Sequence, residues 1–217
     1  MSLSDLSSTP RTALNRHRER GRTGRDDLYA VLDTGLICHL GVIADGVPRV
    51  LPTGYGRLCD ILYLHGSSAN STFMAGAGRE VCVTVTHLDG LVCARSVFNH
   101  SMNYRSAMIF GVARLLTDPA ERLVALRVIT EQLVPGQWSY ARQPSNKELA
   151  ATSVLALPLT EASVKIRSGG PSDEPEDYAT DVWAGVVPVT MVFGEPEPDA
   201  VLPSGTAVPP HILKRGV

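Results

Sequence analysis

Short strand-like segments separated by turn signals fill the first half of this chain and restrict its fold more than any other feature. Residues 35–43 and 47–56 predict two strands around the turn Ala44-Asp45-Gly46, and residues 61–66 predict a third strand after the turn Leu58-Cys59-Asp60. An Asp-Gly pair between apolar runs is a strong local signal of a β-hairpin. Strand after strand at hairpin spacing predicts an antiparallel barrel.

The pattern continues to residue 116. It is clearest in residues 80–87, where valines occupy one side of the strand and small polar residues the other. Leu88-Asp89-Gly90 predicts a further hairpin, and residues 91–98 and 103–116 then predict the last strands of a continuous antiparallel meander. The fold class expected is therefore mainly β with flanking helices.

Helices and a long tail surround the predicted barrel. Asp26-Asp27 open a short amphipathic helix that ends at Gly35, and Asp118-Pro119 open a longer one that Pro135-Gly136 terminates. Residues 153–167 predict one last long strand, interrupted at Pro158 and so placed at a sheet edge or bulge. We expect a basic arm (1–25), a barrel domain (26–170) and an extended C-terminal segment (171–217) that packs on the barrel or on a partner subunit.

Composition narrows the class of protein. Of 217 residues, 44% are hydrophobic and 19% charged, which is typical of a water-soluble globular protein. No apolar run reaches the roughly 20 residues that span a bilayer, and the first residues lack the apolar centre of a signal peptide. These features predict a cytoplasmic protein without a membrane contact.

Familiar catalytic and metal motifs do not occur. The four cysteines form no C-x-x-C pair with zinc-like spacing, so buried free thiols and no metal site are expected. The sequence has no nucleophile elbow, phosphate loop, dinucleotide-binding glycine motif or H-E-x-x-H. No catalytic side chain is predicted.

Positive charge gathers in the first 25 residues. Six arginines lie between Arg11 and Arg25, offset there only by Glu19, although the whole chain carries a net charge of −2. The arm could contact phosphate on a cofactor or on nucleic acid, or it could be a solvated segment. The net charge makes nucleic acid the weaker expectation.

Polar side chains cluster where the predicted strands end. Residues 64–72, LHGSSANST, offer hydroxyls and free amides that suit an anion, or that cap a helix. His65 could hydrogen-bond a ring carbonyl or a substrate, or be structural. Arg105, beside Ser106, could hold a phosphate in bidentate fashion, or form an ion pair. Lys165 and Arg167 point the same way along one strand, shortly before Trp183, and suit a charged flat ligand or a solvated strand face.

Several motifs in order carry a resemblance to a known family. They are RHRERG (16–21), VLDTGLICHLGVIADGVPRVLPTGYGR (31–57), LYLHGS (62–67), VTVTHLDGLVCARSVFNHSMNYRSAMIFG (83–111), LVPGQW (133–138), and EASVKIRSGGPSD with WAGVVP (161–188). The chain resembles the flavin-binding proteins related to pyridoxamine 5′-phosphate oxidase, in the split-barrel superfamily that includes nitroimidazole reductases.

The resemblance implies a fold, a partner and a cofactor. It implies an antiparallel split β-barrel that forms a homodimer and binds FMN in two equivalent interface clefts. The flavin ring would lie along Pro52 to Tyr55 and the phosphate near the turn from His65 to Thr72. The cofactor-binding residues implied are Thr53, Gly54, Tyr55, His65, Gly66, Ser67, Ser71, Thr72, Arg105, Ser106, Lys165, Arg167 and Trp183.

One departure from the family pattern falls at the phosphate. Relatives usually present a basic residue near positions 71 and 72, where this chain has Ser71 and Thr72. Arg105, Lys165 or the basic arm could supply the missing charge.

These observations predict an FMN-dependent oxidoreductase that acts on an unknown small molecule, with His65 donating a hydrogen bond to the ring or the substrate. The alternative is a non-catalytic flavin or tetrapyrrole carrier that uses the same cleft. A regulator that binds DNA through the basic arm is a weaker third hypothesis.

Overall fold

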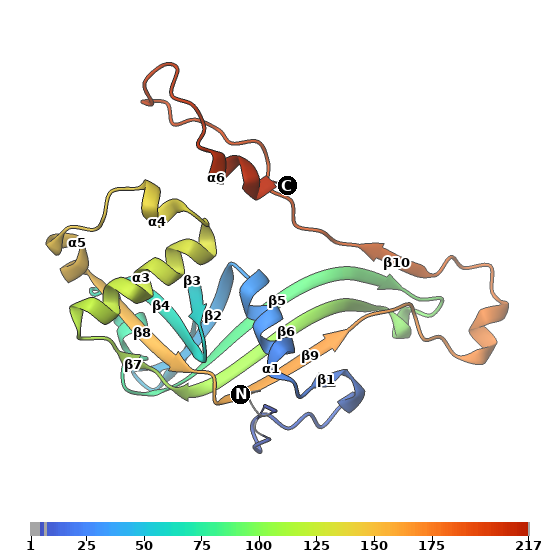
Figure 1. Cartoon of the computed structure of the whole chain (residues 1–217). Helices are drawn as coiled ribbons and strands as arrows, with labels where there is room; N and C mark the ends of the chain where they lie inside the picture. The colour runs from blue at the N-terminus through green and yellow to red at the C-terminus, as the bar shows by residue number, and fades with distance from the viewer. Residues whose placement is uncertain (1–4, 7, 217) are drawn as a thin grey trace.

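The computed structural model describes residues 5, 6 and 8–216, so residues 1–4 and 7 of the predicted arm lie outside it. Within this range, ten strands form one antiparallel sheet with helices around it (Figure 1). The strands are β1 (Gly21–Arg22), β2 (Ile37–Ala44), β3 (Val47–Leu58), β4 (Ile61–Ser67), β5 (Glu80–Cys93), β6 (Ser101–Val112), β7 (Arg114–Leu115), β8 (Thr152–Pro158), β9 (Glu161–Arg167) and β10 (Gly185–Pro188). The helices are α1 (Arg25–Thr34), α2 (Ser71–Met74), α3 (Pro119–Leu133), α4 (Gln137–Tyr140), α5 (Asn146–Ala151) and α6 (Pro210–Leu213), and 3-10 turns cover Arg18–Arg20, Val97–Asn99, Pro175–Ala179 and Lys214–Gly216.

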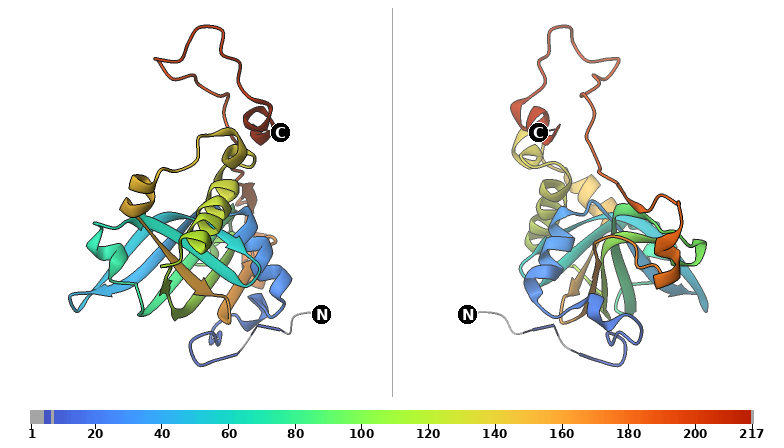
Figure 2. Two further views of the ribbon diagram at one scale, coloured as in Figure 1. Left: turned by 60° about the vertical axis from the view of Figure 1, so that its left-hand side comes forward. Right: turned by 90° about the vertical axis from the view of Figure 1, so that its right-hand side faces the viewer.

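The strand order is β1-β9-β6-β5-β2-β3-β4-β8-β7, with β10 paired to β5. The hairpins β2-β3 and β3-β4 are confirmed. The continuous meander is wrong, because β5 pairs with β2 instead of β4. The chain leaves β4, passes through α2 and returns on the far side of β2. The predicted mainly β class with flanking helices is confirmed, and the sheet curls around its core into a split barrel (Figure 2).

The predicted hairpin at Leu88-Asp89-Gly90 is also wrong. β5 runs unbroken through these residues, and its register with β6 shifts between Leu88 and Gly90, which marks a β-bulge at Asp89. An Asp-Gly pair often marks a turn, but it is also compatible with a β-bulge. In a bulge, one extra residue of the strand has no hydrogen-bonded partner on the neighbouring strand. The chain reverses later instead, at the 3-10 turn Val97–Asn99.

The single last strand is in fact two. β8 ends at Pro158, and after Leu159 and Thr160 the chain continues as β9. β8 pairs with β4 and β7, whereas β9 pairs with β6 and β1. This corner carries the chain from one half of the sheet to the other.

The main core fills the inside of the sheet. The larger side chains in it that are under 2% exposed include Leu28 and Leu32 of α1, Leu40, Tyr55, Leu62, Leu64, Phe73, Ile109, Leu155, Leu157 and Leu159. α3 covers the other side of β3, β4 and β8 through a second cluster built on Tyr63, Ala125 and Ile129. The close approach of α3 to β3 requires glycine at position 56, since a Cβ there would lie 2.7 Å from the carbonyl carbon of Val128.

The C-terminal segment leaves the barrel along β5. β10 adds to the far end of β5, and the chain then returns to α6, which lies beside α4 (Figures 1 and 2). His211 Nε2 lies 2.9 Å from Gln137 Oε1, and its ring is 5.1 Å from that of Tyr140. No helix in the described part of the chain is long and apolar enough to cross a membrane.

Candidate functional site

The sheet has an outer face, defined here as the side opposite the main core. Strand alternation places Ile37, His39, Gly41 and Ile43 of β2 on it, opposite Gly54, Pro52, Val50 and Pro48 of β3. Several large apolar side chains on this face are exposed, among them Ile37 (58%), Ile43 (55%), Val50 (66%) and Val112 (50%). An apolar patch of this kind is typical of a surface that another molecule covers.

A row of polar residues crosses the same face from the other edge. Lys165 of β9 pairs with Ser106 of β6, which pairs with Thr86 of β5. The Ser106 hydroxyl donates to the Lys165 carbonyl at 3.4 Å. Four residues that the resemblance implied, Gly54, Ser106, Lys165 and Arg167, therefore share the outer face.

Arg105 lies on the opposite side of the sheet from Ser106, because neighbouring residues of a strand alternate. The implied pairing of the two side chains in one cleft is therefore wrong. Arg105 is instead ion-paired, with its Nε 3.0 Å and its Nη2 2.9 Å from the carboxylate of Asp89. The bidentate bond to Asp89 raises the pKa of Arg105.

Arg105 and Asp89 line a cleft of about 850 Å³. The end of α1, the bulge of β5, the end of α3 and residues 189–193 of the C-terminal segment enclose it. His87 lines it as well, with Nε2 2.9 Å from the Val31 carbonyl oxygen. Most charged groups of the cleft are already paired: Glu131, for example, accepts from the amides of Gly136 and Trp138.

Tyr55 does not line any cleft, contrary to what the resemblance implied. Its side chain is fully buried in the main core, and its hydroxyl donates to the Leu32 carbonyl at 2.6 Å. Burial raises the pKa of this phenol well above its usual value. Thr53 points to the same side of β3 as Tyr55, and its hydroxyl donates to the carbonyls of Gly54 and His65 at 3.3 Å.

The imidazole of His65 has a buried nitrogen that makes no hydrogen bond to the described residues. It is half-buried at the end of β4, and its Nδ1 is buried without a hydrogen-bond partner among the described residues. Burial lowers the pKa of the imidazole below its ordinary value of 6.5, so the ring is neutral at neutral pH. A buried nitrogen without a partner is costly and is commonly explained by a missing ligand or water.

The polar turn after β4 forms a compact cluster at the rim of the barrel. Asn70 caps α2 by accepting from the Phe73 amide at 3.1 Å, and the Ser67 hydroxyl accepts from the Ala69 amide. The capping alternative is thus confirmed for Asn70. Ser71 and Thr72 form the first turn of α2, Ser71 exposed and Thr72 half-buried, and Gly66 leaves room for the Phe73 ring.

A cation not predicted from the sequence completes this cluster. Arg49 of β3 donates from Nη1 to the Thr72 hydroxyl at 3.0 Å, its Nη2 lies 3.5 Å from the carboxylate of Asp45, and its side chain remains 42% exposed. Charge at the neutral positions 71 and 72 thus comes from a neighbouring strand. Arg105 lies on the long β5-β6 pair, and Lys165 lies toward the opposite edge of the sheet from β4, so neither reaches Thr72 within one chain.

Lys165, Arg167 and Trp183 do not form one basic and aromatic face. Lys165 donates to the Arg16 carbonyl at 3.3 Å, and Arg167 donates to Asn103 and to the carbonyls of Gly169 and Gly170. Trp183 is 67% exposed and lies against Gly185, beside β10. Among the described residues, no group of three His, Cys, Asp or Glu side chains could hold a metal ion.

Comparison with known proteins agrees with this architecture. The family model for pyridoxamine 5′-phosphate oxidase matches residues 24–166. No curated protein sequence matches the chain closely enough to count as a relative.

Two solved structures are similar over nearly the whole chain. The flavocytochrome Anf3 from Azotobacter vinelandii is 40% identical with a TM-score of 0.91, over 97% of this chain and 98% of that one. The FAD and haem binding protein from Mycobacterium smegmatis is 38% identical with a TM-score of 0.87, over 91% and 97%. A candidate 5-nitroimidazole antibiotic resistance protein from Bacteroides thetaiotaomicron shares the fold at 21% identity and a TM-score of 0.58, over 67% and 86%.

Proposed function

Because this chain belongs to the pyridoxamine 5′-phosphate oxidase family, we propose that it binds a flavin nucleotide and uses it to oxidise or reduce a small molecule. The phosphate next to the flavin ribityl chain would bind at Arg49, Ser71 and Thr72. The ring would lie on the outer face near Pro52, Gly54 and His65.

The contact between Arg49 and Thr72 carries this proposal. It places a guanidinium against the hydroxyl of Thr72 at the barrel rim, next to the exposed Ser71. Guanidinium forks and hydroxyl donors are the groups that bind phosphate in proteins. Val50, the next residue of β3, points to the opposite side of the strand, onto the outer face, which is apolar and exposed and would suit a flat ring system.

The residues of the chain would orient the flavin, which supplies the redox chemistry when bound. His65 is neutral at neutral pH and only half-buried at the end of β4, where its ring would hydrogen-bond the flavin or a substrate. No side chain need act as a nucleophile.

The test is titration of the purified protein with FMN and with FAD, followed by flavin absorbance and fluorescence. The resemblance predicted FMN, whereas a similar protein is named for FAD. Both carry the phosphate that Arg49 would bind, so both are used. Protein that stays colourless and changes neither spectrum would refute the proposal.

Turnover separates an oxidoreductase from a carrier. An oxidoreductase should oxidise reduced nicotinamide in the presence of electron acceptors faster than the same concentration of free flavin. A carrier should not exceed the free flavin. We propose the oxidoreductase, acting on a substrate that this measurement can screen for.

We also propose that the exposed apolar part of the outer face is covered in a homodimer. Val50, at 66% exposure, lies in its middle. Val50→Asp should convert the dimer to a monomer in light scattering, because a charge cannot be desolvated there without a partner. Val201→Asp, on an exposed part of the C-terminal segment, is the matched control.

Haem is a second candidate ligand, favoured by His65. Two similar structures are named as a flavocytochrome and as an FAD and haem binding protein. Burial keeps the imidazole of His65 neutral at neutral pH, and neutral imidazole is a common metal ligand. Haemin titration should give a Soret band that His65→Ala abolishes and that His100→Ala, at an exposed turn, does not.

A further inference from the structure

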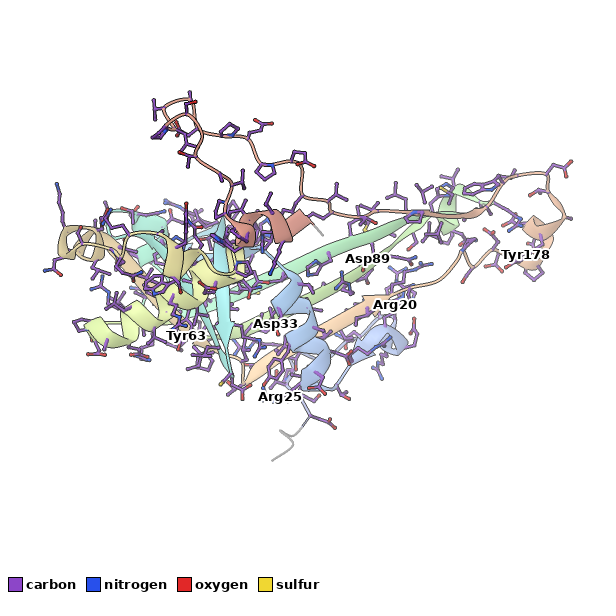
Figure 3. The ribbon with its side chains drawn as sticks, turned by 45° about the horizontal axis from the view of Figure 1, so that its top comes forward. Arg20, Arg25, Asp33, Tyr63, Asp89 and Tyr178 are labelled. Carbon is purple, nitrogen blue, oxygen red and sulfur yellow. The ribbon has the colours of Figure 1, made fainter. Side chains whose placement is uncertain are left out.

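The N-terminal basic arm is part of a larger cation cluster that only the folded chain assembles. β1 pairs with β9, which places Gly21 opposite Lys165. Arg20 therefore lies beside β9 (Figure 3), and its charge acts on the guanidinium of Arg167. We define the basic cluster as Arg16, whose carbonyl accepts from Lys165, together with Arg20, Lys165 and Arg167.

The positive charge of this cluster is largely uncompensated. Among the described residues, Glu19 is the one carboxylate in an ion pair with any of these four cations, at 3.6 Å from Arg20, and it also lies 3.1 Å from His17. The other cations contact neutral groups where they have contacts. Lys165, for example, donates to the carbonyl of Arg16.

The surroundings of Arg167 show the effect of the uncompensated positive charge most clearly. Arg167 is half-buried and held by the amide oxygen of Asn103 and two glycine carbonyls. Burial, and then the nearby charge of Arg20, lower its pKa. Like charges held at close range repel each other, and an anion bound between them would relieve the repulsion.

We propose that the basic cluster binds the phosphate groups of a nicotinamide dinucleotide, the electron donor, with the 2′-phosphate of NADPH as its main anchor. The proposal rests on the proposed flavin function.

The cluster lies at one end of the polar row on the outer face. Lys165 pairs with Ser106 of β6, and Ser106 pairs with Thr86 of β5. β5 in turn pairs with β2, and β2 pairs with β3. Four strand spacings separate β9 from β3, or about 19 Å at roughly 4.8 Å per spacing. This is comparable to the length of an extended dinucleotide. A donor anchored by its phosphates at β9 could thus present its nicotinamide to a flavin on β3.

The reduced nicotinamide dinucleotide and the flavin together account for all the electrons in the proposed step. The dihydronicotinamide gives up a hydride and is oxidised, and the flavin accepts that hydride together with one proton from water and is reduced. The cluster takes no part in this step. It binds and orients the donor.

The experiment measures binding of the unreactive NADP⁺ by calorimetry, separately from flavin titration. Arg20→Ala/Lys165→Ala should weaken NADP⁺ binding about tenfold or more, as loss of charge-assisted hydrogen bonds to phosphate predicts. Flavin affinity should stay unchanged. Native protein should bind NADP⁺ more tightly than NAD⁺, and added salt should narrow the difference.

Arg79→Ala/Lys147→Ala is the matched control. It removes the same two charges at exposed positions, where no side-chain contact holds either residue among those the structure describes. It should leave NADP⁺ binding unchanged.

Three results would overturn the proposal. One is equal NADP⁺ binding by the cluster variant and native protein. Another is an equal loss in the charge-matched control, which would indicate a general field effect. The third is loss of flavin binding in the cluster variant with NADP⁺ binding intact, which would assign the cluster to the flavin. Failure of the flavin function itself would appear separately, as absence of flavin binding by native protein.

Discussion

Arg49 on β3 donates a 3.0 Å hydrogen bond to the hydroxyl of Thr72 in α2. The two residues are 23 positions apart, and the bond joins the rim of the barrel to the short helix that follows β4. It places a cation beside two positions whose own side chains are neutral.

Arg49→Ala should weaken flavin binding by about 10- to 100-fold, the loss expected for a charge-assisted hydrogen bond to phosphate. The flavin affinity of Arg49→Lys should lie between those of the native protein and Arg49→Ala, because an ammonium keeps the charge but not the bidentate geometry of the guanidinium. Flavin fluorescence titration gives the affinities, with Arg79→Ala as a control for lost charge. Native affinity in Arg49→Ala would place the phosphate elsewhere.

Tyr55→Phe should cost about 1 kcal/mol of unfolding free energy and leave flavin affinity unchanged. The hydroxyl lies in the core and donates to the Leu32 carbonyl at 2.6 Å, which keeps a second bond from Gln132 at 3.1 Å. Urea unfolding and flavin titration test both parts. A tenfold loss of flavin affinity without loss of stability would return Tyr55 to the binding site.

Stability should fall as the pH drops below 6.5, partly because of His65. Burial lowers the pKa of this imidazole in the folded state, so the unfolded chain takes up the proton first. The contribution of His65 is therefore fully present above pH 6.5 and is lost as the pH falls through and below that value. His65→Gln should flatten this part of the profile of melting temperature against pH. An unchanged profile would show that the imidazole titrates as it does in the unfolded chain.

Gly56→Ala should destabilise the fold by about 2–3 kcal/mol, whereas Gly54→Ala should cost less than about 1 kcal/mol. A Cβ at 56 would lie 2.7 Å from the backbone of Val128 in α3, which cannot move alone. A Cβ at 54 would meet only the flexible end of Leu133, at 3.2 Å. Chemical unfolding of the two variants compares them directly. Equal losses would mean that α3 can shift away from β3.

Local patterns in the sequence were enough to predict most elements. The hairpins around Asp45-Gly46 and Cys59-Asp60 formed as expected, since their turn residues and alternating apolar runs act over a few residues. The helices after Asp26-Asp27 and Asp118-Pro119 likewise begin and end close to their predicted limits, because capping is also local.

Pairing between distant strands could not be predicted in this way. The sequence at Leu88-Asp89-Gly90 has the composition of a turn, yet β5 continues through it because β6 pairs along its whole length. The order that puts β5 beside β2 depends on how all the apolar faces enclose one core. No local signal carries that information.

The same division holds for the candidate site. Residue types and their spacing were enough to identify the polar turn of residues 64–72, the basic arm and the alternation of Lys165 with Arg167. The motifs were enough to identify the family. Only the tertiary structure decided that Tyr55 belongs to the core, that Arg105 is occupied by Asp89, and that Arg49 reaches Thr72. Side-chain partners depend on which strand comes to lie beside which, and the whole sheet sets that arrangement.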